Sequence, residues 1–246
     1  MSIRPIRHVK PIRLIVVFLV LLSLSAFVYF KYVQAATNCW TGAGATENWS
    51  ETANWSLGVA PGVSGNTTNL ATFGSASCAS GLTKNVTIDT NIDVSGTGGG
   101  ILISATTNAY TGIITQGTST ITIGTGNYSQ SAGTFTGGSG TITINGSYSL
   151  TGGTFTSTSG TMTIAWTTFT ISGSPIFSAN SGTVTFTAGT TIACNNVTFN
   201  TVIINRNSNN TFTAGYFNLQ SITRNRREIC RRGSNQQNPR FIHLNR

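Results

Sequence analysis

The chain has few side chains that could act as acids, bases or metal ligands. It contains only 5 Asp and Glu residues, and most of them precede residue 94. Paired carboxylates can hydrolyse polysaccharides, and clustered oxygen ligands can bind Ca²⁺. Asp89 and Asp93 would face solvent about 13 Å apart in an extended strand, which is too wide for a catalytic pair. Glu47 and Glu51 flank Trp49, but two carboxylates on a loop are a weak ion site.

The middle of the chain offers little else for catalysis. Between residues 100 and 220 there is no Asp, Glu, His or Lys, and Arg206 is the only charged side chain. No cysteine pair has the short spacing that zinc sites use. We therefore expect no enzyme activity, no catalytic residue, no cofactor and no metal site. A polysaccharide-degrading β-helix enzyme is the weakest of the functional alternatives.

A tryptophan-rich stretch, "CWTGAGATENWSETANWSLGVAPG", contains Trp40, Trp49 and Trp55. Asn48 and Asn54 precede the last two rings, and asparagine is suited to turns. In one interpretation the rings cover the apolar end of a stacked fold, whose first strands would otherwise present open edges. In the other, the rings and asparagine amides form an exposed glycan-binding site. We favour the cap and keep glycan contact as the alternative.

Cys39 and Cys78 flank this stretch. In an oxidising compartment they could form a disulfide, which would close a loop of about 40 residues and contribute roughly 3–4 kcal/mol. Two buried free thiols are the alternative. Cys194 has no evident partner, and Cys230 lies in an atypical tail.

The formal charge of +9 is concentrated at the two ends of the chain. Five basic residues lie in the first 31, and seven arginines follow residue 220. Residues 36–220 carry two basic and four acidic side chains, which gives −2. A phosphate-binding face therefore has little support, and we expect no nucleic-acid partner.

Residues 1–35 are typical of a targeting segment. A basic stretch precedes the uncharged apolar run from Leu14 to Phe30. This run is longer than the usual apolar region of a signal peptide and just long enough to span a bilayer. "VQA" at Val33–Ala35 permits cleavage before Ala36, and a retained N-terminal anchor is the alternative. Either outcome predicts an extracytoplasmic protein, secreted or at the cell surface, that meets a membrane only through residues 14–30.

From about residue 108 the chain repeats at intervals of about 20 residues. Each repeat contains a strand in which threonine alternates with a large apolar residue, the period-2 pattern of a half-buried strand. The four strands are Thr120–Ile123, Thr141–Ile144, Thr161–Ile164 and Thr183–Phe186. Units this short cannot bury their apolar side alone, so neighbours must stack.

The repeats predict an all-β fold, a right-handed parallel β-helix with almost no helix after residue 36. Ile142 would lie over Met162 and Val184, and Ile144 over Ile164 and Phe186. The matching threonines, Thr141, Thr161 and Thr183, would form an outer ladder. Gly140, Gly160 and Gly182 precede these strands, where a corner needs positive φ or close backbone approach. An antiparallel sandwich is the competing fold.

The stretch from Cys39 to Phe73 resembles the entry segment of bacterial surface β-helix proteins of the autotransporter-associated and filamentous-haemagglutinin-like type. The matching motifs are W-T-G-x-G, N-W-S, G-x-x-P and a short A-T-F strand. The residues that fit are Trp40, Thr41, Gly42, Gly44, Asn54, Trp55, Ser56, Gly58, Pro61 and Phe73. The resemblance implies a secreted or surface passenger-like protein and transfers no catalytic residue.

We expect four regions in the chain: 1–35, a signal peptide or membrane anchor; 36–80, the cap; 81–222, the β-helix rungs; and 223–246, a basic tail. The tail abandons the threonine and glycine pattern, and a frameshift or truncation would explain the change. The predicted function is an exported structural or adhesin-like surface β-solenoid, with surface glycans or host and neighbouring cell surfaces as possible partners. A dedicated glycan-binding module is the alternative.

Overall fold

The computed structural model describes residues 35–166, 168–188, 190–194, 197–205, 211–214 and 217–225. The predicted signal or anchor segment, residues 14–30, lies outside the described residues, as does Cys230. A single 3-10 turn, η1 (Thr52–Asn54), is the only helical element of the described part. None of the helical structure described is long and apolar enough to cross a membrane.

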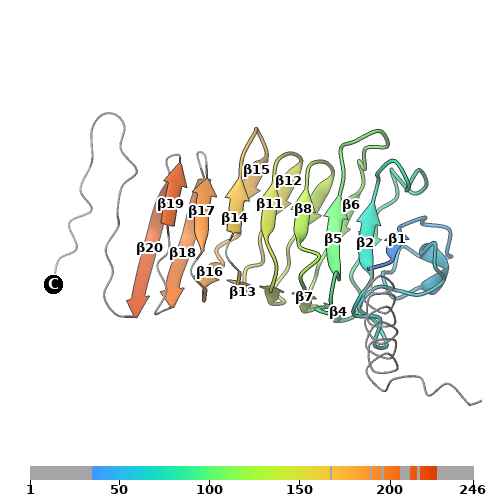
Figure 1. The fold of residues 1–246 in the computed structure, drawn as a ribbon, viewed down its shortest axis with the longest axis horizontal. Coiled ribbons are helices and arrows are strands. Elements are labelled where there is room, and N and C mark those ends of the chain that lie inside the picture. The colour runs from blue at the N-terminus through green and yellow to red at the C-terminus, as the bar shows by residue number, and fades with distance from the viewer. Residues whose placement is uncertain are drawn as a thin grey trace, which may run out of the picture. The chain divides into compact units, whose positions relative to one another are not determined.

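The strands belong to three sheets (Figure 1). The first sheet has the order β1 (Thr37–Cys39), β2 (Leu70–Phe73), β5 (Gly100–Ile103), β8 (Tyr128–Gln130), β11 (Tyr148–Leu150), β14 (Thr168–Ile171), β17 (Thr191–Cys194), β19 (Thr211–Ala214). The second has the order β4 (Ile92–Val94), β7 (Ile121–Ile123), β10 (Ile142–Ile144), β13 (Thr161–Ile164), β16 (Thr183–Phe186), β18 (Val197–Asn205), β20 (Phe217–Asn225). The third has the order β3 (Val86–Thr87), β6 (Ile113–Thr115), β9 (Thr134–Thr136), β12 (Thr154–Thr156), β15 (Ile176–Ser178).

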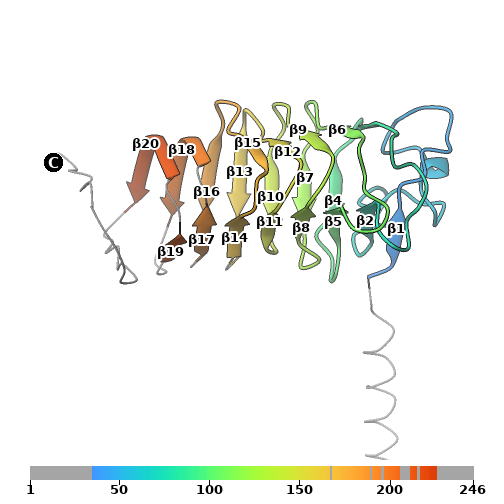
Figure 2. The same cartoon turned by 90° about the horizontal axis from the view of Figure 1, so that it is seen from above.

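Every pairing between these named strands is parallel, for example β10 with β7 and with β13. The chain visits the sheets in turn, so that β7, β8 and β9 make one rung and β10 begins the next. Figure 2 shows strands of successive rungs side by side along the stack. This arrangement is consistent with the predicted parallel β-helix. The antiparallel sandwich is wrong, because its sheets would pair neighbouring strands in opposite directions.

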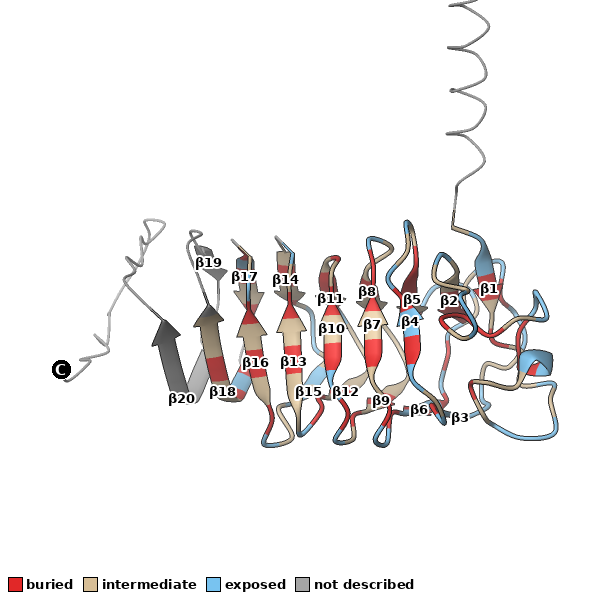
Figure 3. Cartoon of the chain, turned by 90° about the horizontal axis from the view of Figure 1, so that it is seen from below, coloured by how far each residue is buried: buried red, intermediate tan, exposed pale blue. Residues whose placement is uncertain are grey.

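The predicted register of the core is confirmed. Ile142 pairs with Met162, which pairs with Val184, and the column beside it runs from Ile144 through Ile164 to Phe186. All six side chains are buried. Figure 3 shows buried and half-exposed positions alternating along these strands. The alternation follows from the period of 2, which sends apolar residues inward and threonines outward.

Two aromatic columns also run through the interior. Tyr148 stacks on Tyr128 and on Phe169, with ring centroids 5.2 and 4.6 Å apart. The other column stacks Phe155 between Phe135 and Phe177, at 5.0 and 5.8 Å. Stacked rings in equivalent positions bury a large apolar area and hold neighbouring rungs in register.

The glycine corners use both of the predicted devices, at different positions. A Cβ on Gly140 or Gly182 would collide with a carbonyl oxygen of the preceding rung, from Ser119 or Thr158. By contrast, Gly133 and Gly153 adopt positive φ, 61° and 73°, which glycine reaches at no steric cost. Close approach therefore explains the glycines that precede the threonine strands.

Near the C-terminal end, β18 and β20 pair in parallel from Val197↔Phe217 to Asn205↔Asn225. Strand β20 continues to Asn225, beyond Ile222, where the sequence places the end of the rungs. The remainder of the basic tail lies outside the described residues.

Candidate functional site

The first turn of the fold, residues 36–80, supplies the first strand of one sheet and bonds to the starting edges of the other two. Strand β1 pairs with β2 at the edge of the first sheet. At the third sheet, the Trp49 amide donates to the Thr87 carbonyl at 2.8 Å. At the second, the Asp93 amide donates to the Gly62 carbonyl at 2.9 Å. At the second and third sheets, these backbone groups of the starting strands are therefore partnered.

The three tryptophans of this turn form one buried cluster. Trp40, Trp49 and Trp55 are 1%, 0% and 2% exposed. Trp55 lies edge-on to both other rings, with centroids 5.2 and 4.7 Å away, and all three rings pack against Phe73. The Trp49 indole N–H donates to the Pro61 carbonyl at 2.7 Å, and that of Trp55 to the Trp49 carbonyl at 2.8 Å.

The burial of Trp40, Trp49 and Trp55 favours the predicted cap over the alternative in which these rings stack on sugars. A glycan-stacking ring must present a face to solvent, and these faces are covered by one another and by Phe73. Large rings are buried here because the end of the stack leaves a wide apolar space that smaller side chains would not fill.

Asn54 organises the loop around this cluster and is itself 0% exposed. Its amide group donates to the carbonyls of Thr46 and Asn48 at 2.9 and 3.0 Å, and its oxygen accepts the Gly44 amide at 2.8 Å. The burial and hydrogen bonds of Asn54 favour a role in holding the loop over the predicted glycan contact, because its polar atoms are already bonded within the loop. Asn48 is half-buried and joins the third sheet through a parallel bridge to Thr87.

Glu51 closes the same loop from the outside. Its carboxylate accepts the Thr46 hydroxyl at 2.5 Å and the amides of Ala45 and Thr46 at 2.7 and 2.8 Å. These hydrogen bonds, the one from the Thr46 hydroxyl first, lower the pKa of Glu51 below its usual value of 4.5. These hydrogen bonds from Ala45 and Thr46 to the Glu51 carboxylate hold the loop closed, and we call them the clasp.

The two aspartates have comparable local roles. Asp89 is exposed and accepts both the amide and the hydroxyl of Ser50, which ties the first turn to the third sheet's beginning. Asp93 is exposed and accepts the Ser95 amide at 2.9 Å. Both face solvent, as the alternation predicts. Among the described residues, no three His, Cys, Asp or Glu side chains gather at one point.

A disulfide joins Cys39, at the end of β1, to Cys78, in the loop after β2, with Cα atoms 5.4 Å apart. It links the first strand of the stack to a buried position in the following loop. Cys194 is a buried free thiol, and burial raises its pKa to about 12. A thiol with that pKa is protonated at neutral pH, so it behaves as a small core residue.

The interior holds polar side chains as well. Gln130 is fully buried, accepts the Tyr128 hydroxyl at 2.6 Å and donates to the Thr154 carbonyl at 3.0 Å. Gln116 similarly donates to the carbonyls of Ser119 and Gly140. These amides satisfy backbone carbonyls at the corners of the rungs. Each of the two glutamines also joins its own rung to the next one, through the carbonyl of Gly140 or Thr154, and so stabilises the stacking of the rungs.

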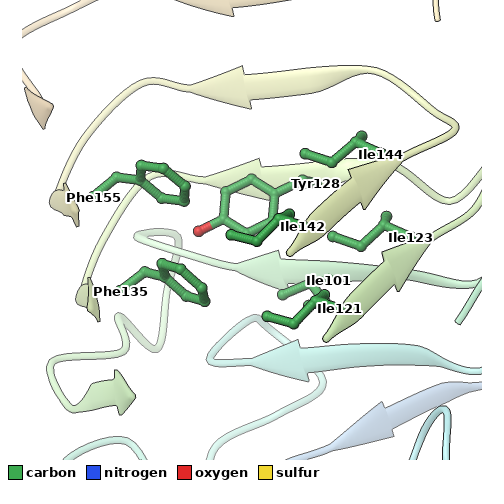
Figure 4. A pocket seen from close by; sticks show the side chains of 8 residues that line it. All are labelled: Ile101, Ile121, Ile123, Tyr128, Phe135, Ile142, Ile144 and Phe155. Carbon is green, nitrogen blue, oxygen red and sulfur yellow. The ribbon is translucent and has the colours of Figure 1, made fainter. Parts of the chain in front are cut away.

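A void lies within the core and is lined by apolar side chains and the Tyr128 ring, with Phe135 and Phe155 on one side and isoleucines on the other (Figure 4). It has no room for a water molecule. An apolar space of this size stays dry and is a packing defect between rungs. It therefore offers no binding cavity.

The outer face of the second sheet carries an ordered array of threonines, which we call the threonine lattice. It has two columns of four residues, one residue from each of four neighbouring rungs. The columns are Thr120, Thr141, Thr161, Thr183 and Thr122, Thr143, Thr163, Thr185. Seven of these side chains are half-buried and Thr141 is exposed. The predicted ladder of Thr141, Thr161 and Thr183 is one part of this array.

The third sheet presents a smaller array that sequence reasoning did not assign to a face. One of its columns runs through Thr134 and Thr154 and ends in Ile113 and Ile176, which are 43% and 64% exposed. The repeated "GTFT" motifs could have predicted this array. Phe135 and Phe155, which lie between the threonines, are buried. Inward phenylalanine places both flanking threonines outside.

Comparison of the chain with protein-family models, with curated proteins and with solved structures finds no match in any of the three.

Proposed function

We propose that this chain is an exported structural or adhesive β-solenoid that displays flat, uncharged outer faces to a surface outside the cytoplasm. The observation that carries the proposal is the in-register threonine lattice on the second sheet. Threonines recur there at equal spacing while the core beneath them is filled by isoleucine, methionine, valine and phenylalanine. A regular outer face on a rigid stack suits broad contact with an extended surface.

The proposed location is extracytoplasmic, either secreted or at the cell surface. The basic and apolar residues of segment 1–35 support export as a signal peptide or a retained anchor. The disulfide between Cys39 and Cys78 supports an oxidising compartment. Concentration of basic charge at the ends argues against a nucleic-acid partner.

The finer architecture is also proposed here. The β-helix is right-handed, as parallel crossovers nearly always are, and residues 36–80 act as its N-terminal cap. The hydrogen bonds to the starting edges of two sheets and the buried tryptophan cluster support the cap. The W-T-G-x-G and N-W-S motifs support kinship with surface β-helix proteins of the autotransporter-associated and filamentous-haemagglutinin-like type. This resemblance implies a passenger-like protein and transfers no catalytic residue.

Surface glycans or the surfaces of host and neighbouring cells are the proposed partners. The buried rings of Trp40, Trp49 and Trp55 do not favour a dedicated glycan-binding module. Contact through threonine side chains would be weak per residue and would gain strength from repetition along the stack.

Adsorption of the purified exported chain to intact cells tests the proposal. We expect the protein to appear in the extracytoplasmic fraction and to sediment with cells. A glycan array separates adhesion from specific recognition, since binding to one defined glycan would favour the module. Retention in the cytoplasm, or turnover of an acidic polysaccharide by the pure protein, would contradict the proposal.

A further inference from the structure

The threonine lattice is regular in two directions. Along the stack, Thr122, Thr143, Thr163 and Thr185 are successive Cα partners in parallel strands, which lie about 4.8 Å apart. In the other column Thr161 pairs with Thr183, and Thr120 and Thr141 directly precede the paired residues of β7 and β10. Along each strand, the two threonines are separated by one inward residue, a repeat of about 6.6 Å. The pairings across β7, β10, β13 and β16 show no register shift. The face is therefore a small two-dimensional lattice of identical groups.

The side chains of the lattice are held in place before any ligand arrives. Threonine is β-branched and stiff at χ1, and each inner threonine is flanked by one from the rung on either side. Among the described residues, no hydrogen bond uses the hydroxyl of any of the eight threonines, whereas Thr46 and Thr158 donate theirs to protein acceptors. The lattice thus presents ordered methyl groups beside hydroxyls that only solvent can satisfy.

The composition of the face narrows what could bind it. Asp93 is the Cα partner of Thr122 on the preceding rung. Among the residues whose side chains are described, it is the only charged one that continues either column. An ionic ligand would find no complementary charge. Within the eight threonines a sugar chain would find no ring to stack on, because Trp166, which is 42% exposed, lies beyond the end of β13. The eight threonines cover on the order of 300 Å², well below the roughly 800 Å² per partner of a stable protein interface.

We propose that the threonine lattice binds ice. The surface of crystalline water is uncharged and periodic, with repeats close to those of the lattice, so the hydroxyls can occupy or bond to positions of the ice lattice. The fixed methyl groups order the water between them, which limits the entropy lost when that water joins the crystal. This inference rests on the proposed function, because it names the surface that the outer face contacts.

Other faces of the same stack are less suited to this ligand. On the first sheet, the outward column that contains Ser129, Ser149 and Thr170 ends in Ala193. Serine lacks the methyl group and rotates more freely than threonine. On the third sheet, the column of Thr134 and Thr154 has only two threonines, because the exposed Ile113 and Ile176 lie at its two ends. The second sheet is therefore the expected ice-binding face, and the first sheet supplies a matched control.

Adsorption to a slowly growing ice surface tests the proposal with the exported full chain. The double variant Thr143→Tyr and Thr163→Tyr keeps good strand formers but places bulk at the centre of the lattice. Ser149→Tyr makes the same change on the first sheet. We expect the wild-type protein and Ser149→Tyr to enter the ice and to widen the gap between melting and freezing, and the double variant to be excluded from ice.

A second variant guards against loss of folding. Thr143→Ser and Thr163→Ser removes only two methyl groups, and we expect reduced ice adsorption with an unchanged circular dichroism spectrum. Exclusion of the folded wild-type protein from ice would overturn the inference. Equal adsorption of the double tyrosine variant would also overturn it, as would binding to crystalline cellulose or chitin in place of ice. Cell adsorption measured on the same samples reports on the proposed function separately, since it can persist when ice binding fails.

Discussion

The first turn of the solenoid and the rungs between Ile121 and Phe186 fill their interiors in different ways. In the first turn, three indole rings meet edge to face, and each makes contacts that no other residue repeats. In the rungs, many side chains stack on similar ones above and below, as Phe155 does between Phe135 and Phe177. Irregular packing ends the stack, and repeated packing extends it.

This difference predicts how much a substitution in each region should lower the free energy of unfolding. A unique contact has no substitute, so its loss should expose the first edge of the sheets. In a stacked fold, the free energy of unfolding is nearly the sum of contributions from each rung and from each contact between neighbouring rungs. A repeated contact is therefore only one of many similar contributions. Effects in the first turn should therefore be larger than comparable changes in the rungs.

The largest effect is expected for Trp49→Ala. Trp49 is 0% exposed, packs on Trp55 and Phe73, and donates to the Pro61 carbonyl. Removing a buried ring of this size costs about 3–5 kcal/mol. The free energy of unfolding, from denaturant titration, measures the loss.

Trp166→Ala is the matched control, because Trp166 is 42% exposed. Its substitution should change the free energy of unfolding by less than about 0.5 kcal/mol. Equal losses for the two tryptophans would break the distinction between the first turn and the rungs.

The disulfide comes next. Mass spectrometry of non-reduced peptides from the exported protein should find Cys39 joined to Cys78. Replacing both by serine should lower the free energy of unfolding by about 3–4 kcal/mol, because the unfolded chain gains the freedom of the opened loop. Free thiols at both positions after export would contradict the pairing.

A change in the repeated core should cost less. Ile144→Val deletes one methylene-sized group from a column that continues through Ile123 and Ile164. The expected loss is about 0.5–1.5 kcal/mol. A loss in the free energy of unfolding as large as that of Trp49→Ala would show that the rungs do not tolerate substitutions better than the first turn does.

The smallest effect concerns Glu51 and its dependence on pH. Hydrogen bonds from Thr46 and Ala45 lower the pKa of this carboxyl, so its contribution to stability is present above the unfolded value of 4.5 and is lost as the pH falls through the folded value. Wild type should therefore exceed Glu51→Gln in melting temperature near neutral pH. The gap should close in acid, and a gap that persists at low pH would contradict the clasp.

Much of the rung architecture could be predicted because the sequence repeats itself. Thr141–Ile144 and Thr161–Ile164 share spacing and alternation, which specify both the inward face and the register with the next rung. Parallel pairing then follows, since equivalent segments stack only when they run in the same direction. Glycine before each strand marked the corners, and the close approach at Gly140 gives the reason.

The first turn was less predictable for a physical reason. A tryptophan ring suits a buried core and an exposed sugar platform equally, so residue type could not decide between the two. Asn54 was placed among the possible glycan contacts because asparagine amides commonly bind sugars. Its burial depends on partners distant from it in sequence, such as Gly44. Gln116 and Gln130 were overlooked for the same reason, although inward parity at Tyr128 would have placed Gln130 inside.

The central claim is that the outward threonines contact a surface while the first turn and the core maintain the fold. The most direct test measures cell adsorption and melting temperature together for the variant Thr143→Lys and Thr163→Lys, with Ser149→Lys as the control. The account predicts unchanged melting and lost adsorption for the threonine variant, with both properties retained in the control. Undiminished adsorption by a folded threonine variant would contradict it.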